Sequence, residues 1–189
     1  MRDPIDEVLH TVHRRDFLAQ HEQDVADLDT ALPIAGGQTN SQPSTVAAML
    51  RLLEVRPGDR VLDVGAGSGW STALLSRLVG PDGVVLGVER VAELIEPARR
   101  AVRPYAVGRT EILPARPGVL GLPEQAPFDR ILVSAEAAEV PRQLLEQLAD
   151  GGVLVIPVAG QMLRVRRRGR RFQRSRHGRY RFVPLITDA

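Results

Sequence analysis

The sequence predicts an α/β fold: a Rossmann-like, doubly wound and mostly parallel sheet of about seven strands with a C-terminal antiparallel hairpin. Three observations predict it. Between residues 60 and 158, short apolar runs alternate with runs of helical period. A glycine-rich turn, Gly65 to Gly69, directly follows the first apolar run. From residue 161 onwards, two polar runs flank a turn rich in glycine and arginine, which is typical of a hairpin.

The residues before the sheet predict helices and a loop. Residues 4–18 have apolar side chains at helical spacing, with Pro4 suited to a first turn, so they predict a helix. Residues 19–31 are polar and predict an irregular connection. Residues 32–43 hold too many glycines and prolines for a regular element, so we expect a loop that presents polar side chains. Residues 44–54 predict a second helix.

The alternating part supplies the remaining elements. The expected parallel strands span residues 60–64, 84–88, 110–113, 130–134 and 153–158. The expected helices span residues 71–79, 91–102 and 141–148, and residues 150–152 predict a turn. The hairpin strands are expected at residues 161–167 and 179–185.

The composition predicts a single domain, residues 1–189, with no linker. Within it we distinguish an N-terminal helical and loop region (1–56), a core (57–160) and an arginine-rich hairpin (161–189). The chain has no cysteine, which excludes disulfides, thiolate metal sites and a cysteine nucleophile. No apolar run is long enough to span a membrane, and the charged N-terminus lacks the apolar core of a signal peptide. We therefore expect a cytoplasmic protein without a membrane partner.

The net charge of +2 conceals an asymmetry. Residues 161–189 contain ten arginines and one acidic residue, whereas the rest of the chain is net acidic. A basic end of this kind can attract nucleic acid or an acidic protein, or it can be a solvated hairpin. Nucleic acid is the less favoured partner, and the oligomeric state cannot be predicted.

The glycine-rich turn indicates the class of cofactor. Its glycines alternate, and Trp70 occupies the position where a dinucleotide-binding fingerprint has its third glycine. No Gly-Lys-Ser/Thr follows, so the phosphate-binding loop of nucleotide hydrolases is also excluded. An acidic residue followed by G-x-G-x-G resembles the S-adenosylmethionine (SAM) site of class I, Rossmann-like methyltransferases. The residues that this resemblance places at the cofactor are Asp63, Gly65, Ala66, Gly67, Ser68 and Gly69.

Two further segments should meet the turn at the carboxyl edge of the sheet. Glu89 ends the second strand, at an offset from the turn that suits a carboxylate accepting hydrogen bonds from ribose hydroxyls. Residues 113–121 follow the third strand and should flank the adenine. A purely structural, capping Glu89 is the alternative.

Residues 32–186 resemble the protein-L-isoaspartate O-methyltransferase family. The resemblance rests on several motifs. They are Gly-Gln-Thr-Asn-Ser-Gln-Pro (37–43), Pro-Gly-Asp-Arg-Val-Leu-Asp-Val-Gly (57–65), Pro-Phe-Asp-Arg-Ile-Leu-Val (127–133), Gly-Gly-Val-Leu-Val-Ile-Pro-Val (151–158) and Phe-Val-Pro-Leu (182–185).

The resemblance implies methyl transfer from SAM to the free α-carboxylate of an isoaspartyl residue in a protein or peptide. It assigns the catalytic role to Ser41, a cofactor contact to Thr39 and substrate contacts to Asn40 and Gln42. Because a carboxylate is ionised at pH 7, the reaction needs alignment rather than a strong base. Ser41 could alternatively cap the following helix.

The sequence departs from the family pattern in two places. Asn40 stands where the family usually has Ile, and Ala115-Arg116 stand where it has Gly-Asp. Two other functions therefore stay open. The chain could methylate another acidic peptide or small carboxylate, or it could be a catalytically silent SAM-fold protein that binds a partner or nucleic acid through its arginine-rich end.

Overall fold

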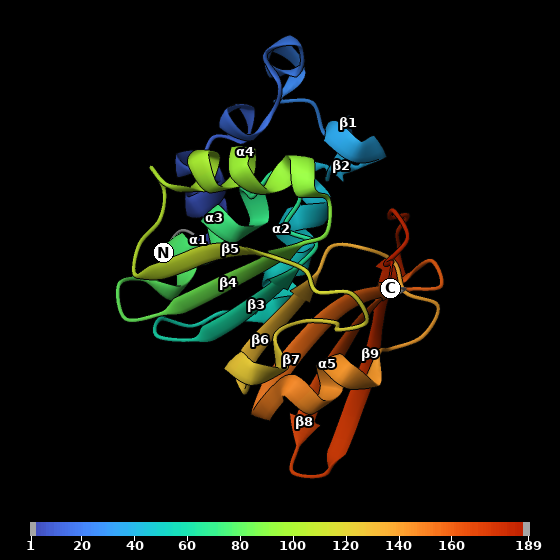
Figure 1. The fold of residues 1–189 in the computed structure, drawn as a ribbon. Coiled ribbons are helices and arrows are strands. Elements are labelled where there is room, and N and C mark those ends of the chain that lie inside the picture. The colour runs from blue at the N-terminus through green and yellow to red at the C-terminus, as the bar shows by residue number, and fades with distance from the viewer. Residues whose placement is uncertain (1–2, 187–189) are drawn as a thin grey trace.

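The computed structural model describes residues 3–186 and contains one seven-stranded sheet (Figure 1). The strand order is β5-β4-β3-β6-β7-β8-β9. The strands are β3 (Arg60–Val64), β4 (Val84–Glu89), β5 (Arg109–Pro114), β6 (Phe128–Val133), β7 (Leu148–Val158), β8 (Gln161–Arg168) and β9 (Arg171–Arg179). β3 to β7 are parallel, whereas β8 and β9 pair antiparallel. The predicted fold class is confirmed.

Helices cover both faces of the central strands β3, β4 and β6, which is why these strands are mostly apolar. Side chains alternate along each strand: Val61 and Val85 belong to one core, and Leu62 and Leu86 to the other. The first core lies under α1 (Pro4–Thr11), α2 (Pro43–Leu53), α3 (Trp70–Val79) and α4 (Ala92–Val102). The second lies under α5 (Arg142–Gln147), on the side of the sheet opposite α4 in Figure 1.

The chain order creates a switch point at β3. After β3, the chain forms β4 and β5 on one side of β3. It then returns to form β6 on the other side of β3. The carboxyl ends of β3, β4 and β6 therefore diverge into separate connections at one edge. Ligands of open α/β sheets bind at such a point.

The N-terminal helix is shorter than predicted. It ends at Thr11, and Arg14–Phe17 form a turn of 3₁₀ helix instead of its continuation to residue 18. The Val12 carbonyl accepts a hydrogen bond from the indole N–H of Trp70 (3.1 Å), and Val12 itself is extended. A tertiary partner thus replaces the helical one. The connection from 19 to 31 also contains 3₁₀ helix, at Gln20–Val25.

The predicted loop at 32–43 contains a small antiparallel pair. β1 (Leu32–Pro33) pairs with β2 (Thr39–Asn40), and Ala35–Gly37 turn between them. Farther along, the predicted turn at 150–152 is wrong: these residues belong to β7, which shifts register against β6 between Phe128 and Arg130. A bulge absorbs the glycines without ending the strand.

The second hairpin strand is misplaced in the sequence prediction. It spans Arg171–Arg179 rather than 179–185, because Gly169 (φ 57°) closes a tight turn that pairs Arg168 with Arg171. Residues 180–186 leave the hairpin and run beside Glu136 instead. Residues 187–189 of the predicted hairpin region, and residues 1–2 of the N-terminal region, lie outside the described residues.

No helix within residues 3–186 is long and apolar enough to cross a membrane. The interpretation of residues 1–189 as a single domain stays a prediction.

Candidate functional site

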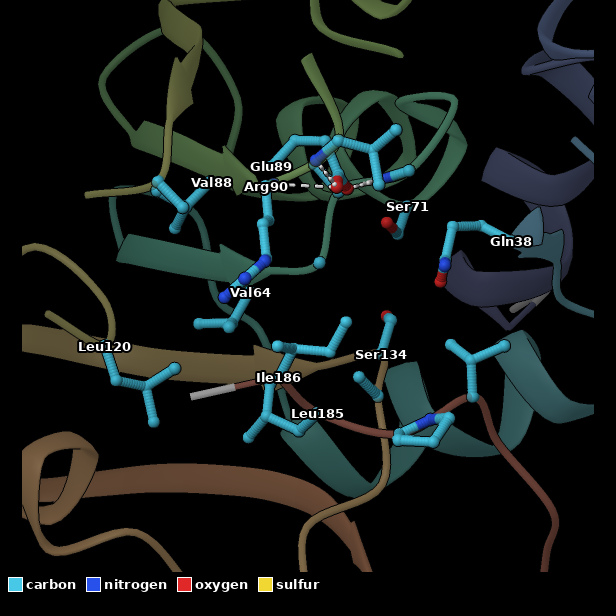
Figure 2. A pocket seen from close by; sticks show the side chains of 18 of the residues that line it. Gln38, Val64, Ser71, Val88, Glu89, Arg90, Leu120, Ser134, Leu185 and Ile186 are labelled. Carbon is cyan, nitrogen blue, oxygen red and sulfur yellow. Dashed lines mark hydrogen bonds between the residues drawn. The ribbon is translucent and has the colours of Figure 1, made fainter. Parts of the chain in front are cut away.

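A cavity of about 360 Å³ opens at the carboxyl ends of β3, β4 and β6, at the switch point (Figure 2). Five segments of the chain supply most of its lining. They are residues 38–41, the glycine turn, residues 88–91, residues 115–121 and residues 183–186. Its volume lies in the range of small-molecule sites. The sequence prediction placed the first four of these segments near the ligand but missed the last.

Most of the glycine turn faces the cavity. Gly65, Ala66, Gly67 and Ser68 line it, and Gly65 and Gly67 have positive φ (79° and 57°). Gly69 does not line it, although the sequence placed it at the cofactor. Gly69 packs against α4 instead, where an added Cβ would lie 2.7 Å from Val102 Cγ2. It allows the turn and α4 to approach closely.

Asp63 lies beneath the turn rather than in the cavity. It is fully buried, and its Oδ2 accepts hydrogen bonds from the hydroxyls of Ser71 and Thr72, both at 2.7 Å. Its Oδ1 has no hydrogen-bond partner among the described residues. Burial raises the pKa of Asp63 to about 6. The hydrogen bonds from the two hydroxyls lower the pKa, and the neighbouring charge of Glu89 raises it. Asp63 thus anchors the first turn of α3 from below.

Glu89 lies at the cavity wall and is fixed by backbone donors. Oε1 accepts from the N–H groups of Arg90 (2.7 Å) and Val91 (2.8 Å), and Oε2 accepts from Gly67 N–H (2.6 Å). The structure therefore contains the capping contacts that the alternative interpretation expected. Each carboxylate oxygen can accept more than one hydrogen bond, so capping leaves acceptor capacity for a ligand at the cavity.

The opposite wall comes from the segment after β1. Gln38, Thr39, Asn40 and Ser41 line the cavity, and Figure 2 shows Gln38 across it from Glu89. The side chain of Asn40 is buried and its amide is engaged by other protein groups. Gln42 does not line the cavity within the described residues; its Nε2 donates to Ser44 Oγ at 2.9 Å.

The C-terminal segment forms the wall that sequence reasoning missed. Leu185 and Ile186 lie along one side in Figure 2, and Ile186 is 49% exposed. The segment is held by backbone hydrogen bonds: Glu136 N–H donates to Val183 O, and Leu185 N–H donates to Glu136 O, both at 2.7 Å. The Phe-Val-Pro-Leu motif was the available signal, but it was interpreted as a hairpin strand.

The cavity offers both polar and apolar surface to a ligand. Glu89 supplies a carboxylate acceptor, and Val91 and Leu120 supply apolar surface. The positive φ of Gly65 and Gly67 lets a ligand approach the backbone closely. Arg116 of the loop at 115–121 pairs with Glu124. Among residues 3–186, no group of three or more His, Asp or Glu side chains could hold a metal ion.

Comparisons with known proteins agree with this geometry. The whole chain, residues 1–189, matches the family model described as protein-L-isoaspartate(D-aspartate) O-methyltransferase (PCMT). A protein-L-isoaspartate O-methyltransferase from Methanopyrus kandleri is 43% identical over 187 residues, which cover 96% of this chain and 83% of the relative. One from Roseiflexus sp. is 47% identical over 180 residues, covering 93% of this chain and 80% of the relative.

The fold agrees as well. A solved protein-L-isoaspartate O-methyltransferase of Plasmodium falciparum, in complex with S-adenosyl-L-homocysteine, is similar with a TM-score of 0.88 and 26% sequence identity. The similarity covers 99% of this chain and 92% of that one.

Proposed function

Because the chain belongs to the protein-L-isoaspartate(D-aspartate) O-methyltransferase family, we propose that it methylates the free carboxylate of L-isoaspartyl residues in proteins or peptides, with SAM as methyl donor. The observation that carries the proposal is a single cavity with Glu89 and the glycine turn on one side and Ser41 on the other. The residues proposed to bind the cofactor and the residue proposed to bind the methyl acceptor therefore face the same cavity.

The cofactor is proposed to lie along the wall formed by the glycine turn and Glu89. Glu89 accepts from the ribose hydroxyls, residues 65–68 contact the amino-acid tail, and residues 115–121 flank the adenine. Thr39 borders this wall from the other side. When bound, SAM supplies an electrophilic methyl group that its sulfur releases as the acceptor oxygen bonds to it. The likeness to a relative solved with S-adenosyl-L-homocysteine supports SAM as the cofactor.

The acceptor is proposed to be held by Ser41. Its hydroxyl donates a hydrogen bond to one oxygen of the substrate carboxylate, which leaves the other oxygen free to attack the methyl carbon. The carboxylate is ionised near pH 7, so the protein contributes alignment and exclusion of water. Asn40 and Gln42 already hold protein partners, so we propose that they shape the loop around Ser41.

The deciding experiment is methyl transfer from labelled SAM to two matched peptides, one containing isoaspartate and one aspartate. We expect label only on the isoaspartyl peptide. Ser41→Ala should lower kcat/KM by about tenfold or more, the effect of losing one hydrogen bond to a charged group. Ser175→Ala, on exposed β9, is the matched control. If SAM binds and neither peptide is labelled, the acceptor is another carboxylate; if SAM does not bind, the protein is a silent relative.

The arginine-rich edge is the feature on which a second candidate role, in nucleic-acid binding, would rest. Seven exposed arginines at or beside β9 have side chains without a hydrogen bond or ion pair in the described part of the chain. They are Arg168, Arg170, Arg171, Arg174, Arg176, Arg179 and Arg181. Binding of a single-stranded oligonucleotide would weaken with salt, by about 0.7 in log K per log salt for each neutralised phosphate. We expect no such binding.

The cytoplasmic location stays a prediction.

A further inference from the structure

Arg14 is a buried guanidinium at the centre of a polar cluster beside the cavity. It is 6% exposed, and no acidic side chain within residues 3–186 forms an ion pair with it. Asp29 is the carboxylate whose charge acts on it, while burial lowers the pKa of Arg14. Its guanidinium also lies over the ring of Trp70, with Cζ 5.6 Å from the ring centroid. A charge so placed requires many hydrogen bonds.

Backbone carbonyls supply most of these bonds. Nη1 donates to the carbonyls of Ala26 and Leu28 (both 3.0 Å), and Nη2 donates to those of Thr30 (2.8 Å) and Asn40 (3.1 Å). Nε donates to Asn40 Oδ1 at 2.8 Å. All five N–H donors of the guanidinium are used. One side chain thus fixes the segment from residue 26 to residue 41, which we name the acceptor arm.

Asn40 connects the acceptor arm to the glycine turn. Its Oδ1 accepts from Arg14, and its Nδ2 donates to Ser68 Oγ at 2.9 Å. Ser68 lies in the turn that faces the cofactor, and Ser41 follows Asn40 directly. An Ile at position 40, as is usual in the resembling family, could make neither bond. Asn40 therefore has one hydrogen-bond partner in Arg14 and another in Ser68 of the glycine turn.

The acceptor arm has little apolar packing of its own. Its Ala26, Leu32 and Ile34 belong to a small apolar cluster, separate from the two main cores, that also includes Leu18 and Val25. Segments with few buried apolar contacts open locally at low free-energy cost. The hydrogen bonds of Arg14 and Asn40 therefore help to determine where the arm lies, together with the packing of Ala35–Gly37 on α4 and the bond from Ser44 N–H to Asp29 Oδ1 (2.9 Å).

We infer that Arg14 and Asn40 are positioning residues that fix the acceptor arm against the glycine turn and so place Ser41 for the acceptor. The consequence for catalysis rests on the proposed function. Misplacing a reacting group by about 1 Å can cost about 10²-fold in rate. We therefore expect loss of the Arg14 fork to impair use of the acceptor more than binding of the cofactor product.

The test compares Arg14→Met, Arg14→Lys and Asn40→Ile with the exposed neighbour Arg15→Met as matched control. Three quantities are measured well below each variant's melting temperature. They are hydrogen exchange of residues 26–41, the stoichiometry and Kd of S-adenosylhomocysteine binding, and kcat and KM for the isoaspartyl peptide.

Arg14→Met should speed exchange of the arm and lower kcat/KM by about 10²-fold, with full binding stoichiometry and a smaller change in Kd. Arg14→Lys should not restore slow exchange or wild-type kcat/KM, because the three donors of an ammonium group cannot replace the five donors of a guanidinium. Asn40→Ile should lower kcat/KM by about tenfold. This variant tests the link between the arm and the glycine turn if Arg14→Met fails to fold. A loss of binding stoichiometry in proportion to activity would indicate misfolding and overturn the positioning role.

Two further results would overturn the inference: exchange of the arm in Arg14→Met as slow as in Arg15→Met, or faster exchange with wild-type kcat/KM. If the wild-type protein does not methylate the isoaspartyl peptide, the proposed function fails. Exchange and S-adenosylhomocysteine binding still decide whether Arg14 fixes the arm.

Discussion

The two long walls of the cavity are held in place by different forces. The cofactor wall, residues 65–68 with Glu89, extends from β3 and β4, whose side chains are buried on both faces of the sheet. The acceptor arm lies outside the main sheet, and all five N–H donors of one guanidinium bind it. The cofactor wall is thus held by the apolar core of the sheet, and the acceptor arm is held largely by polar contacts outside it.

Removing the Glu89 carboxylate should have the largest effect on the cofactor wall. Glu89→Ala removes the proposed acceptor of the ribose hydroxyls and leaves the Gly67 N–H without its partner. Hydrogen bonds to charged groups contribute about 1.5–3 kcal/mol each, so we expect SAM affinity to fall by about 10²-fold or more.

Titration calorimetry of the pure protein measures this change. Glu93→Ala, on the exposed side of α4, is the matched control and should bind as the wild type does. A wild-type Kd in Glu89→Ala would mean that Glu89 only caps the chain between β4 and α4. The cofactor would then be held by the glycine turn alone.

Much of the cofactor wall could be predicted from sequence, because its signals are local. Strands buried on both faces are apolar runs, alternating glycines mark the turn, and Glu89 follows directly from the end of its strand. The orientation of Asp63 could not be predicted in this way. An acidic residue at a strand end can point into the cavity or toward α3, and the hydroxyls of Ser71 and Thr72 decide for α3.

The acceptor side was harder to predict, because its contacts are distant in sequence. Arginine is usually a surface residue, and the acceptors of Arg14 lie 12 to 26 positions away in the sequence. The C-terminal wall was misassigned for a related reason. An apolar run at 182–185 resembles a strand, whereas β9 is an arginine-rich edge whose register Gly169 determines. Charged edge strands resist pairing with other chains, so an apolar pattern is not needed there.

Among the changes in stability, adding a side chain at the contact between the turn and α4 should have the largest effect. Gly69→Ala puts a side chain at φ 93°, with its Cβ 2.7 Å from Val102 Cγ2 and 3.2 Å from the Ala98 carbonyl. Backbone strain and overpacking of about 1–3 kcal/mol each predict a loss of about 4 kcal/mol in the free energy of unfolding.

Gly169→Ala is the matched control, since it has φ 57° but no atom within 4 Å of the added Cβ. It should cost about 1 kcal/mol, as expected from conformational strain alone. Chemical denaturation measures both. Equal losses at the two glycines would contradict the close approach of the turn and α4.

Asp63 makes the stability of the cofactor wall depend on pH. Its pKa is raised from 3.8 to about 6 by burial, so the folded chain keeps a proton that the unfolded chain releases between these values. The stabilising contribution of the protonated group is therefore present below about pH 4 and is lost as pH rises through about 6. A shift of about two units corresponds to about 3 kcal/mol. Asp63→Asn removes this titration while keeping an acceptor for Ser71 and Thr72.

The free energy of unfolding of Asp63→Asn, relative to the wild type, should therefore rise by up to about 3 kcal/mol from pH 4 to pH 7 and then level off. Denaturant titrations of both proteins across this range measure the difference, in which other groups cancel. Asp82→Asn, at an exposed turn, should show a constant difference. Parallel curves for Asp63→Asn and the wild type would mean that Asp63 is already ionised in the folded chain near pH 4. The hydroxyls of Ser71 and Thr72 would then offset the effect of burial, and Asp63 would anchor α3 as a carboxylate down to about pH 4.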